Sequence, residues 1–154
     1  MLHVEKKFTF DTPINTLFDF AKDPKHLNLW FAGLGEIDDI KGKGEVGTIV
    51  KTTYFYAGMR YPMTIKYELL TVTPREIQWN LAFTGPVTGN QIAIFKTLPN
   101  DKVEAKFDLR FNVPENFITK IGGVPVATHL LEVALIHTLE NLKTLADVEA
   151  VVPV

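Results

Sequence analysis

The chain has 154 residues, the length of one ordinary domain, and its 46% hydrophobic and 22% charged residues give a globular composition. A formal net charge of −2 offers no basic surface to nucleic acid or to an anionic membrane, so we expect no nucleic-acid partner. The lack of cysteine excludes disulfides, thiolate metal sites and a cysteine nucleophile. We expect a single domain over residues 1–154.

The first ten residues alternate in polarity and predict a β-strand. They lack the apolar run of a signal peptide, and no stretch reaches the ~20 apolar residues of a membrane span. We therefore expect a cytoplasmic protein without stable membrane insertion. Next, Asp11-Thr12-Pro13 predicts a helix start with a capping side chain ahead of the proline. Asp23-Pro24 predicts the end of that helix and the start of a second short one, which carries Leu27 and Trp30.

Segments with an apolar period of two fill the middle of the chain and predict strands. They lie near residues 36–41, 48–57, 61–72, 76–84, 90–98 and 102–113. In the last of these one alternate set is apolar and the other charged, as in an antiparallel sheet with one face in water. Between Gln91 and Phe95 both alternate sets contain apolar residues, so the pattern does not determine which set faces inward.

Helical signals return after Pro114. A short helix is predicted over residues 115–121, Gly122-Gly123 breaks it, and a long helix runs from near Pro125 to about Glu149. This order of elements predicts an α+β fold, because the helices are segregated from the strands. We expect a curved antiparallel sheet of about seven strands wrapped around the long C-terminal helix, with two short helices after the first strand.

With this order of elements the chain resembles the helix-grip fold of the START, polyketide cyclase and pollen-allergen (SRPBCC) superfamily. The local matches are the opening strand with Thr12-Pro13 and an amphipathic helix, Asp23-Pro24 with Trp30, the glycine-rich turn before Thr48, and the leucine-rich closing helix. The resemblance covers nearly the whole chain. It implies a lipid- or polyketide-like ligand held between sheet and long helix. For a minority of members it implies cyclisation or dehydration there, and for others an interaction module.

The segment Gly42–Gly47 matches the pattern Gly-x-Gly-x-x-Gly letter for letter. A dinucleotide site needs a strand before this loop and a helix after it, so that the helix N-terminus meets the pyrophosphate. Here the β-branched run Thr48–Tyr54 follows and predicts a strand. The segment is therefore predicted to be a tight turn between strands, and we expect no cofactor.

The long helix carries polar residues on its apolar face. That face is predicted to hold Ala127, Leu130, Leu131, Ala134, Leu135, Leu142 and Leu145. Thr138 lies near its centre, with His137 and Asn141 toward one edge. A polar group buried against hydrocarbon costs free energy unless it is hydrogen-bonded. Either Thr138 bonds back to the carbonyl of Ala134, or this stretch faces a cavity where ligand or water supplies partners.

Groups suited to metal binding or catalysis are few. A His-x-x-Glu spacing occurs at His129 and again at His137, but the two histidines point in different directions around the helix and no third cluster completes a site. We therefore predict no metal. The adjacent Asp38-Asp39 carboxylates point to opposite faces of a strand, and no Gly-x-Ser-x-Gly motif is present. His137 is the one acid–base candidate near the presumed pocket.

Aromatic residues supply the other predicted lining. Eleven phenylalanines, four tyrosines and two tryptophans give more bulky inward surface than close packing usually needs. Pockets with apolar walls and a few polar groups suit small organic ligands. The predicted ligand-binding residues are Trp30, Tyr54, Tyr67, Trp79, Phe83 and Phe107 from the strands and short helices, and Leu131, Leu135, His137, Thr138 and Asn141 from the long helix.

Three hypotheses for function follow. The favoured one is binding or transport of a small hydrophobic or amphipathic molecule. The second is a cyclase- or dehydratase-like enzyme in the same cavity, whose rate would fall in His137→Ala. The third is a partner-binding module with a filled core, in which the apolar tail Ala150–Val154 either packs on a second copy in a homodimer or frays.

Overall fold

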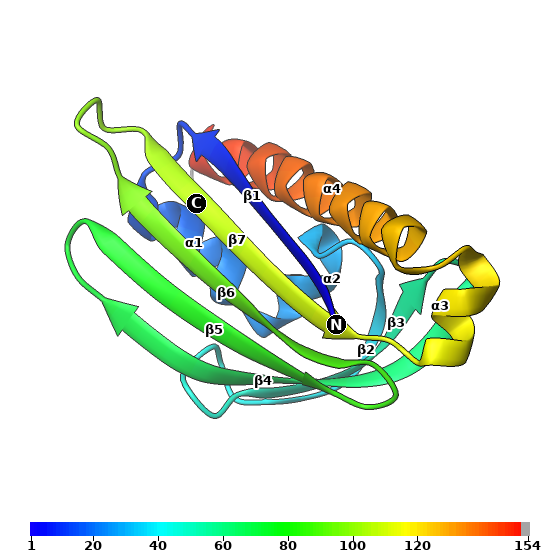
Figure 1. Ribbon diagram of the computed structural model, residues 1–154. Helices are drawn as coiled ribbons and strands as arrows, with labels where there is room; N and C mark the ends of the chain where they lie inside the picture. The colour runs from blue at the N-terminus through cyan, green and yellow to red at the C-terminus, as the bar shows by residue number, and fades with distance from the viewer. Residues whose placement is uncertain (152–154) are drawn as a thin grey trace.

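The computed structural model describes the backbone of residues 1–151 and the side chains of residues 1–148. Its centre is a seven-stranded antiparallel sheet in the order β1-β7-β6-β5-β4-β3-β2 (Figure 1). The strands are β1 (Leu2–Phe10), β2 (Leu34–Lys41), β3 (Ile49–Tyr56), β4 (Met59–Val72), β5 (Glu76–Thr84), β6 (Thr88–Thr97) and β7 (Val103–Asn112). The predicted strands are confirmed, with small differences at their ends.

The helices pack against one face of this sheet. They are α1 (Ile14–Lys22), the 3₁₀ turn η1 (Pro24–His26), α2 (Leu27–Trp30), α3 (Glu115–Ile121) and α4 (Val124–Val151). The long α4 runs beside β1 and contacts α1, α2 and α3 (Figure 1). The predicted α+β architecture is confirmed. None of the helices in the described part of the chain combines the length and the apolar character needed to cross a membrane.

The structure determines which side of β6 faces inward. Gln91, Ala93 and Phe95 are fully buried, whereas Ile92 and Ile94 are half-buried on the outer side. Across the sheet Ala93 pairs with Trp79 of β5 and with Phe107 of β7. Residues directly opposite each other in a sheet share a face, so these two large side chains fix the orientation of β6.

The predicted side-chain cap of α1 is wrong. α1 has no capping hydrogen bond from a side chain, and the hydroxyl of the buried Thr12 instead donates to Asp147 of α4 at 2.9 Å. The next cap is present, since the Asp23 carboxylate accepts from the Lys25 backbone N–H at 3.0 Å. The Gly42–Gly47 segment connects β2 and β3, as predicted for a turn between strands.

The buried face of α4 differs from the prediction at Leu130, which is 37% exposed. Burial confirms Ala127, Leu131, Leu135 and Leu142 as core residues, and adds Leu139 and Ala146. Leu130 is exposed because its side of the helix faces a surface pocket and not the sheet.

Candidate functional site

The strand and short-helix residues predicted to line a cavity meet in the interior and pack against one another. Trp30, Tyr67, Trp79, Phe83 and Phe107 are at most 1% exposed. The Trp30 ring lies 6.1 Å from Trp79 and 6.0 Å from Phe107, measured between centroids, and Tyr67 lies 5.4 Å from Trp79. These are edge-to-face or tilted contacts of the kind that stabilise aromatic cores. The interior is therefore closely packed in this structure.

Thr138 and Asn141 are bonded to protein groups. The Thr138 hydroxyl donates to the Ala134 carbonyl at 2.9 Å and accepts from the Ala32 backbone N–H at 2.9 Å. The Asn141 amide donates to the Trp30 carbonyl at 3.4 Å. The local explanation of Thr138, a bond to Ala134, is thus confirmed. Asn141 holds the end of α2 against α4, and Thr138 holds the segment that follows α2. A role of either side chain in orienting a ligand stays a prediction.

A surface pocket lies between α4 and β3, beside this junction. Its volume is about 220 Å³. The lining residues are Ala32, Gly33, Tyr54, Phe55, Tyr56, Ala57, Leu130, Val133, Ala134 and His137. It therefore includes Tyr54 and His137 of the predicted ligand-binding set. The volume is below the roughly 300–1,000 Å³ of typical small-molecule sites, so a larger ligand would have to displace side chains or α4 itself.

Gly33 shapes the wall of this pocket. Its φ is +98°, and a Cβ there would come within 2.8 Å of the Tyr54 ring and 2.9 Å of the Phe55 carbonyl oxygen. A glycine is therefore needed for the Tyr54 ring to lie against the backbone. Tyr54 in turn packs edge-on to Phe111 at 5.3 Å, and Phe111 to Phe83 at 5.1 Å. This row of rings connects the pocket with the interior.

Buried tyrosines connect the sheet to the helices. The Tyr56 hydroxyl donates to the Ala127 carbonyl of α4, and the Tyr67 hydroxyl to the Lys22 carbonyl of α1, at 2.6 and 2.7 Å. Burial raises the pKa of Tyr56 to about 12 and also raises the pKa values of Tyr54 and Tyr67. All three phenols therefore stay protonated at neutral pH, and those of Tyr56 and Tyr67 act as hydrogen-bond donors.

His137 lies on the exposed side of α4 at the rim of the pocket. The structure therefore brings it near Tyr54 but does not place it in the buried interior with Trp30 and Trp79. Of the other helix pair, His129 is exposed, and Glu132 forms an ion pair with Lys6 of β1 at 2.9 Å. The solvated-face interpretation fits both of these residues.

The inner face of the sheet also contains polar atoms that lack partners. Gln91 is fully buried, and neither atom of its carboxamide has a hydrogen-bond partner among the described residues. The indole N–H groups of Trp30 and Trp79 are likewise buried and unpaired within that part of the chain. Gln91 was not among the predicted site residues, because the sequence pattern leaves the orientation of β6 undetermined. Its inward direction could have been predicted from the neighbouring strands of Trp79 and Phe107, in which the set of residues that faces inward is clear from the sequence.

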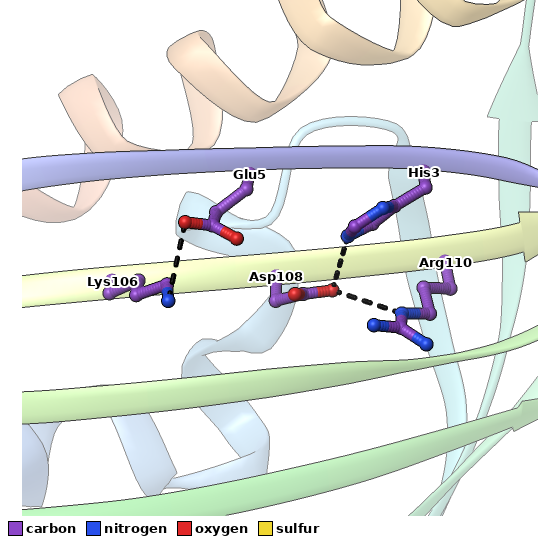
Figure 2. Close-up of polar contacts among 5 residues, drawn as sticks. All are labelled: His3, Glu5, Lys106, Asp108 and Arg110. Atoms are coloured by element: carbon purple, nitrogen blue, oxygen red, sulfur yellow. Dashed lines mark hydrogen bonds and ion pairs between the residues drawn. The ribbon is translucent and has the colours of Figure 1, made fainter.

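A charged cluster occupies the outer face of β1 and β7 (Figure 2). Ligand atoms of His3, Glu5 and Asp108 lie within 4.8 Å of one another, as in some metal sites. However, Asp108 already accepts from His3 Nε2 at 2.9 Å and from Arg110 Nε at 3.3 Å, and Glu5 pairs with Lys106 at 3.2 Å. The carboxylates are neutralised by neighbouring side chains, which is typical of a solvated sheet surface.

A larger hollow, of about 560 Å³, lies along the edge strand β2. Its lining residues are Lys25, Asn28, Glu36, Ile37, Asp38, Asp39 and Ile40. It is a wide surface groove with several charged residues in its walls, and it does not include any of the predicted ligand-binding residues. For an apolar molecule the smaller pocket beside α4 is the better candidate, because its walls are aromatic and aliphatic.

Comparisons by sequence gave no relatives: no model of a known protein family matches the chain, and no curated protein matches it. Solved structures do match. A START superfamily protein from Mycobacterium smegmatis superposes with a TM-score of 0.69 at 13% identity, over 94% of this chain and 97% of that one. The Zhui aromatase/cyclase from Streptomyces sp. R1128 gives 0.63 at 16% identity, over 94% and 93%.

A norcoclaurine synthase from Thalictrum flavum, a point mutant in complex with a transition-state analogue, gives a TM-score of 0.62 at 17% identity, over 94% of this chain and 92% of that one. At these identities the likeness establishes the fold. The chain has the helix-grip, SRPBCC-type fold of these proteins, with a seven-stranded sheet, a long C-terminal helix and short helices after the first strand.

Proposed function

We propose that this protein binds a small, largely apolar molecule between the sheet and α4, and that the pocket beside β3 is where the molecule is admitted. The observation that carries the proposal is that Tyr54, a wall of that pocket, packs against the interior rings of Phe111 and Phe83, so the pocket lining contacts the aromatic core. The chain shares its fold with a START superfamily protein and an aromatase/cyclase, and the resemblance to that fold family implies a ligand at the same location. Opening α4 or turning these rings would convert the small pocket into a full-sized site.

The binding proposal predicts that Ala134→Phe blocks uptake. Ala134 is half-buried and lines the pocket, so a phenyl ring there would fill the space. The affinity for N-phenyl-1-naphthylamine, followed by its fluorescence, should fall on the order of 10-fold or more. The matched control is Thr128→Phe, because Thr128 is a half-buried small residue of the same helix outside the pocket lining.

The outcomes separate the hypotheses. Equal affinities in the two variants would show that the probe is not admitted at this pocket. If the wild type bound no probe, and native mass spectrometry of gently purified protein showed no associated small molecule, the binding proposal would fail. The partner-module hypothesis would then be favoured, supported by the exposed side chains Phe55, Met59, Val124 and Val126 at the same end of the molecule.

The enzyme hypothesis is supported by a different observation. His137 lines the same pocket and is open to solvent, so it can exchange protons with water. The names of the Zhui aromatase/cyclase and of norcoclaurine synthase show that catalysis occurs on this fold. Loss of turnover in His137→Ala, with binding retained, remains the test of this second candidate.

A further inference from the structure

Gln91 is an unusual residue for the centre of this sheet. Its neighbours across the ladder are Leu81 of β5 and Leu109 of β7, which are buried and apolar. The buried polar side chains that the structure describes are otherwise threonines, namely Thr12, Thr48, Thr52 and Thr138. Leaving a carboxamide buried without partners costs free energy. A buried group without partners therefore needs an explanation outside the protein's own hydrogen bonds.

Three side chains with polar groups that lack partners among the described residues lie near one small residue, Ala93. Trp79 is its direct partner on β5, and Gln91 lies two residues before it on the same face of β6. Trp30 packs against Trp79 at 6.1 Å and against Phe107, the partner of Ala93 on β7, at 6.0 Å. Diagonal neighbours in a sheet lie roughly 7–8 Å apart, within reach of long and aromatic side chains, so Gln91 and Trp79 are neighbours on the inner face and Trp30 packs on the second of them.

The chemistry of this cluster favours a hydrogen-bond acceptor as its partner. The carboxamide has two N–H donors and one acceptor, and each indole adds one donor, so donors predominate. No charged side chain is among the buried residues in the described part of the chain. A carboxylate or phosphate would therefore be buried without a counter-charge, which is strongly unfavourable. A neutral carbonyl oxygen satisfies the donors without that penalty.

From this geometry we infer that Gln91 is a specificity-determining residue, which selects an apolar ligand carrying a neutral carbonyl group, such as a ketone, quinone or ester. The inference rests on the proposed function, since it assigns the polar end of the molecule bound between sheet and α4. The carbonyl oxygen accepts from the Gln91 amide beside Trp30 and Trp79, and the apolar remainder extends along the rings toward Tyr54. Gln91 is thus retained for binding at a cost to the stability of the ligand-free protein.

The test compares two probes of nearly equal shape, 2-acetylnaphthalene, which has a ketone, and 2-ethylnaphthalene, which does not. Binding is followed by quenching of Trp30 and Trp79, the two tryptophans of the chain. The wild type should prefer the ketone, and Gln91→Met, which keeps the length of the side chain, should weaken ketone binding on the order of 10-fold or more while leaving the hydrocarbon unchanged. The ligand-free variant should also unfold at a higher denaturant concentration than the wild type.

Gln78→Met is the matched control. Gln78 lies on the outer side of β5 and bonds to Asn80 at 3.3 Å, so its loss should change neither the probe preference nor the inner face. An unchanged ratio of ketone to hydrocarbon affinity in Gln91→Met would overturn the inference and leave the proposed function standing. A lower unfolding midpoint in that variant would also overturn it, since Gln91 would then be satisfied within the protein. Failure of both probes to bind the wild type would instead overturn the proposed function.

Discussion

Thr138 joins two parts of the molecule through one hydroxyl. It donates within α4 to Ala134 and accepts from the backbone of Ala32 in the segment that follows α2. Thr138→Val keeps the shape of the side chain but leaves the Ala32 N–H without this acceptor. We expect it to lower the free energy of unfolding by about 1–3 kcal/mol, measured by urea denaturation.

Thr119→Val provides the comparison for this substitution. Among the described residues the one hydrogen bond of the Thr119 hydroxyl is an exposed bond to the Glu115 carbonyl of its own helix, so its removal should change stability by less than about 0.5 kcal/mol. Equal effects of the two valine substitutions would show that the bond to Ala32 contributes nothing.

The sequence predicted some residues of the candidate site correctly and missed others. The burial of Trp30, Trp79 and Phe107 was predicted and is observed. Whether these side chains line a cavity or fill the core depends on their rotamers, which a sequence pattern does not determine. The exposure of Leu130 was not predicted, because helical periodicity shows which residues share a side and not how far the neighbouring elements extend over it. Gln91 was missed for the related reason that its strand has apolar residues on both sides.

At the scale of the element, α4 is held to the sheet near its N-terminal end by Tyr56. Tyr56→Phe keeps the ring contacts with Tyr54 at 6.3 Å and Phe117 at 6.1 Å but removes the bond to Ala127. We expect faster amide hydrogen exchange in the first half of α4, with little change in β5 to β7. Exchange followed by mass spectrometry on peptides of α4 measures this effect.

Tyr61→Phe is the control for loss of the hydrogen bond between the Tyr56 hydroxyl and α4. Its ring contacts the same Phe117 at 6.2 Å, and the described hydrogen bonds include none from Tyr61 to α4. If both variants left the exchange of α4 unchanged, the helix would be held by apolar packing alone. If exchange increased only in Tyr56→Phe, the hydroxyl would mark the place where α4 opens for a ligand.

Whole elements were predicted more accurately than their ends and caps. The seven strands followed from alternation and the helices from their breaks, because both signals are repeated over many residues. The cap of α1 failed because the helix begins at Ile14 with Pro13 at the N-cap position, so Thr12 lies one residue before the position from which a side chain caps. Local patterns place a helix end only to within a residue or two.

At the scale of the whole molecule, the buried tyrosines make the free energy of unfolding decrease at alkaline pH. Burial raises the pKa values of all four tyrosines in the folded state above the ordinary value of 10.0. Below about pH 10 they are protonated in both states and contribute no pH dependence. Above it the unfolded chain loses these protons while the folded one keeps them, so stability falls until the folded pKa values are reached.

Tyr54 and Tyr67 should each contribute a loss of about 1.4 kcal/mol per pH unit in that window. Denaturation at pH 8 and at pH 11 measures the difference, and tyrosinate absorbance should appear together with unfolding. Tyr54→Phe should make the alkaline loss shallower. Tyrosinate absorbance that rises near pH 10 in the folded protein would contradict this prediction.

The contacts between the start of the chain and α4 also constrain how the protein is made. Lys6 pairs with Glu132, the Thr9 carbonyl accepts from Lys143 at 2.9 Å, and in the described part of the chain β1 has β7 as its one strand partner. On the ribosome, β1 must therefore wait unpaired until β7 has been synthesised. Pairing between strands so far apart in the sequence makes folding slow. Until the pair forms, the unpaired strand edge can bind a chaperone or a neighbouring nascent chain.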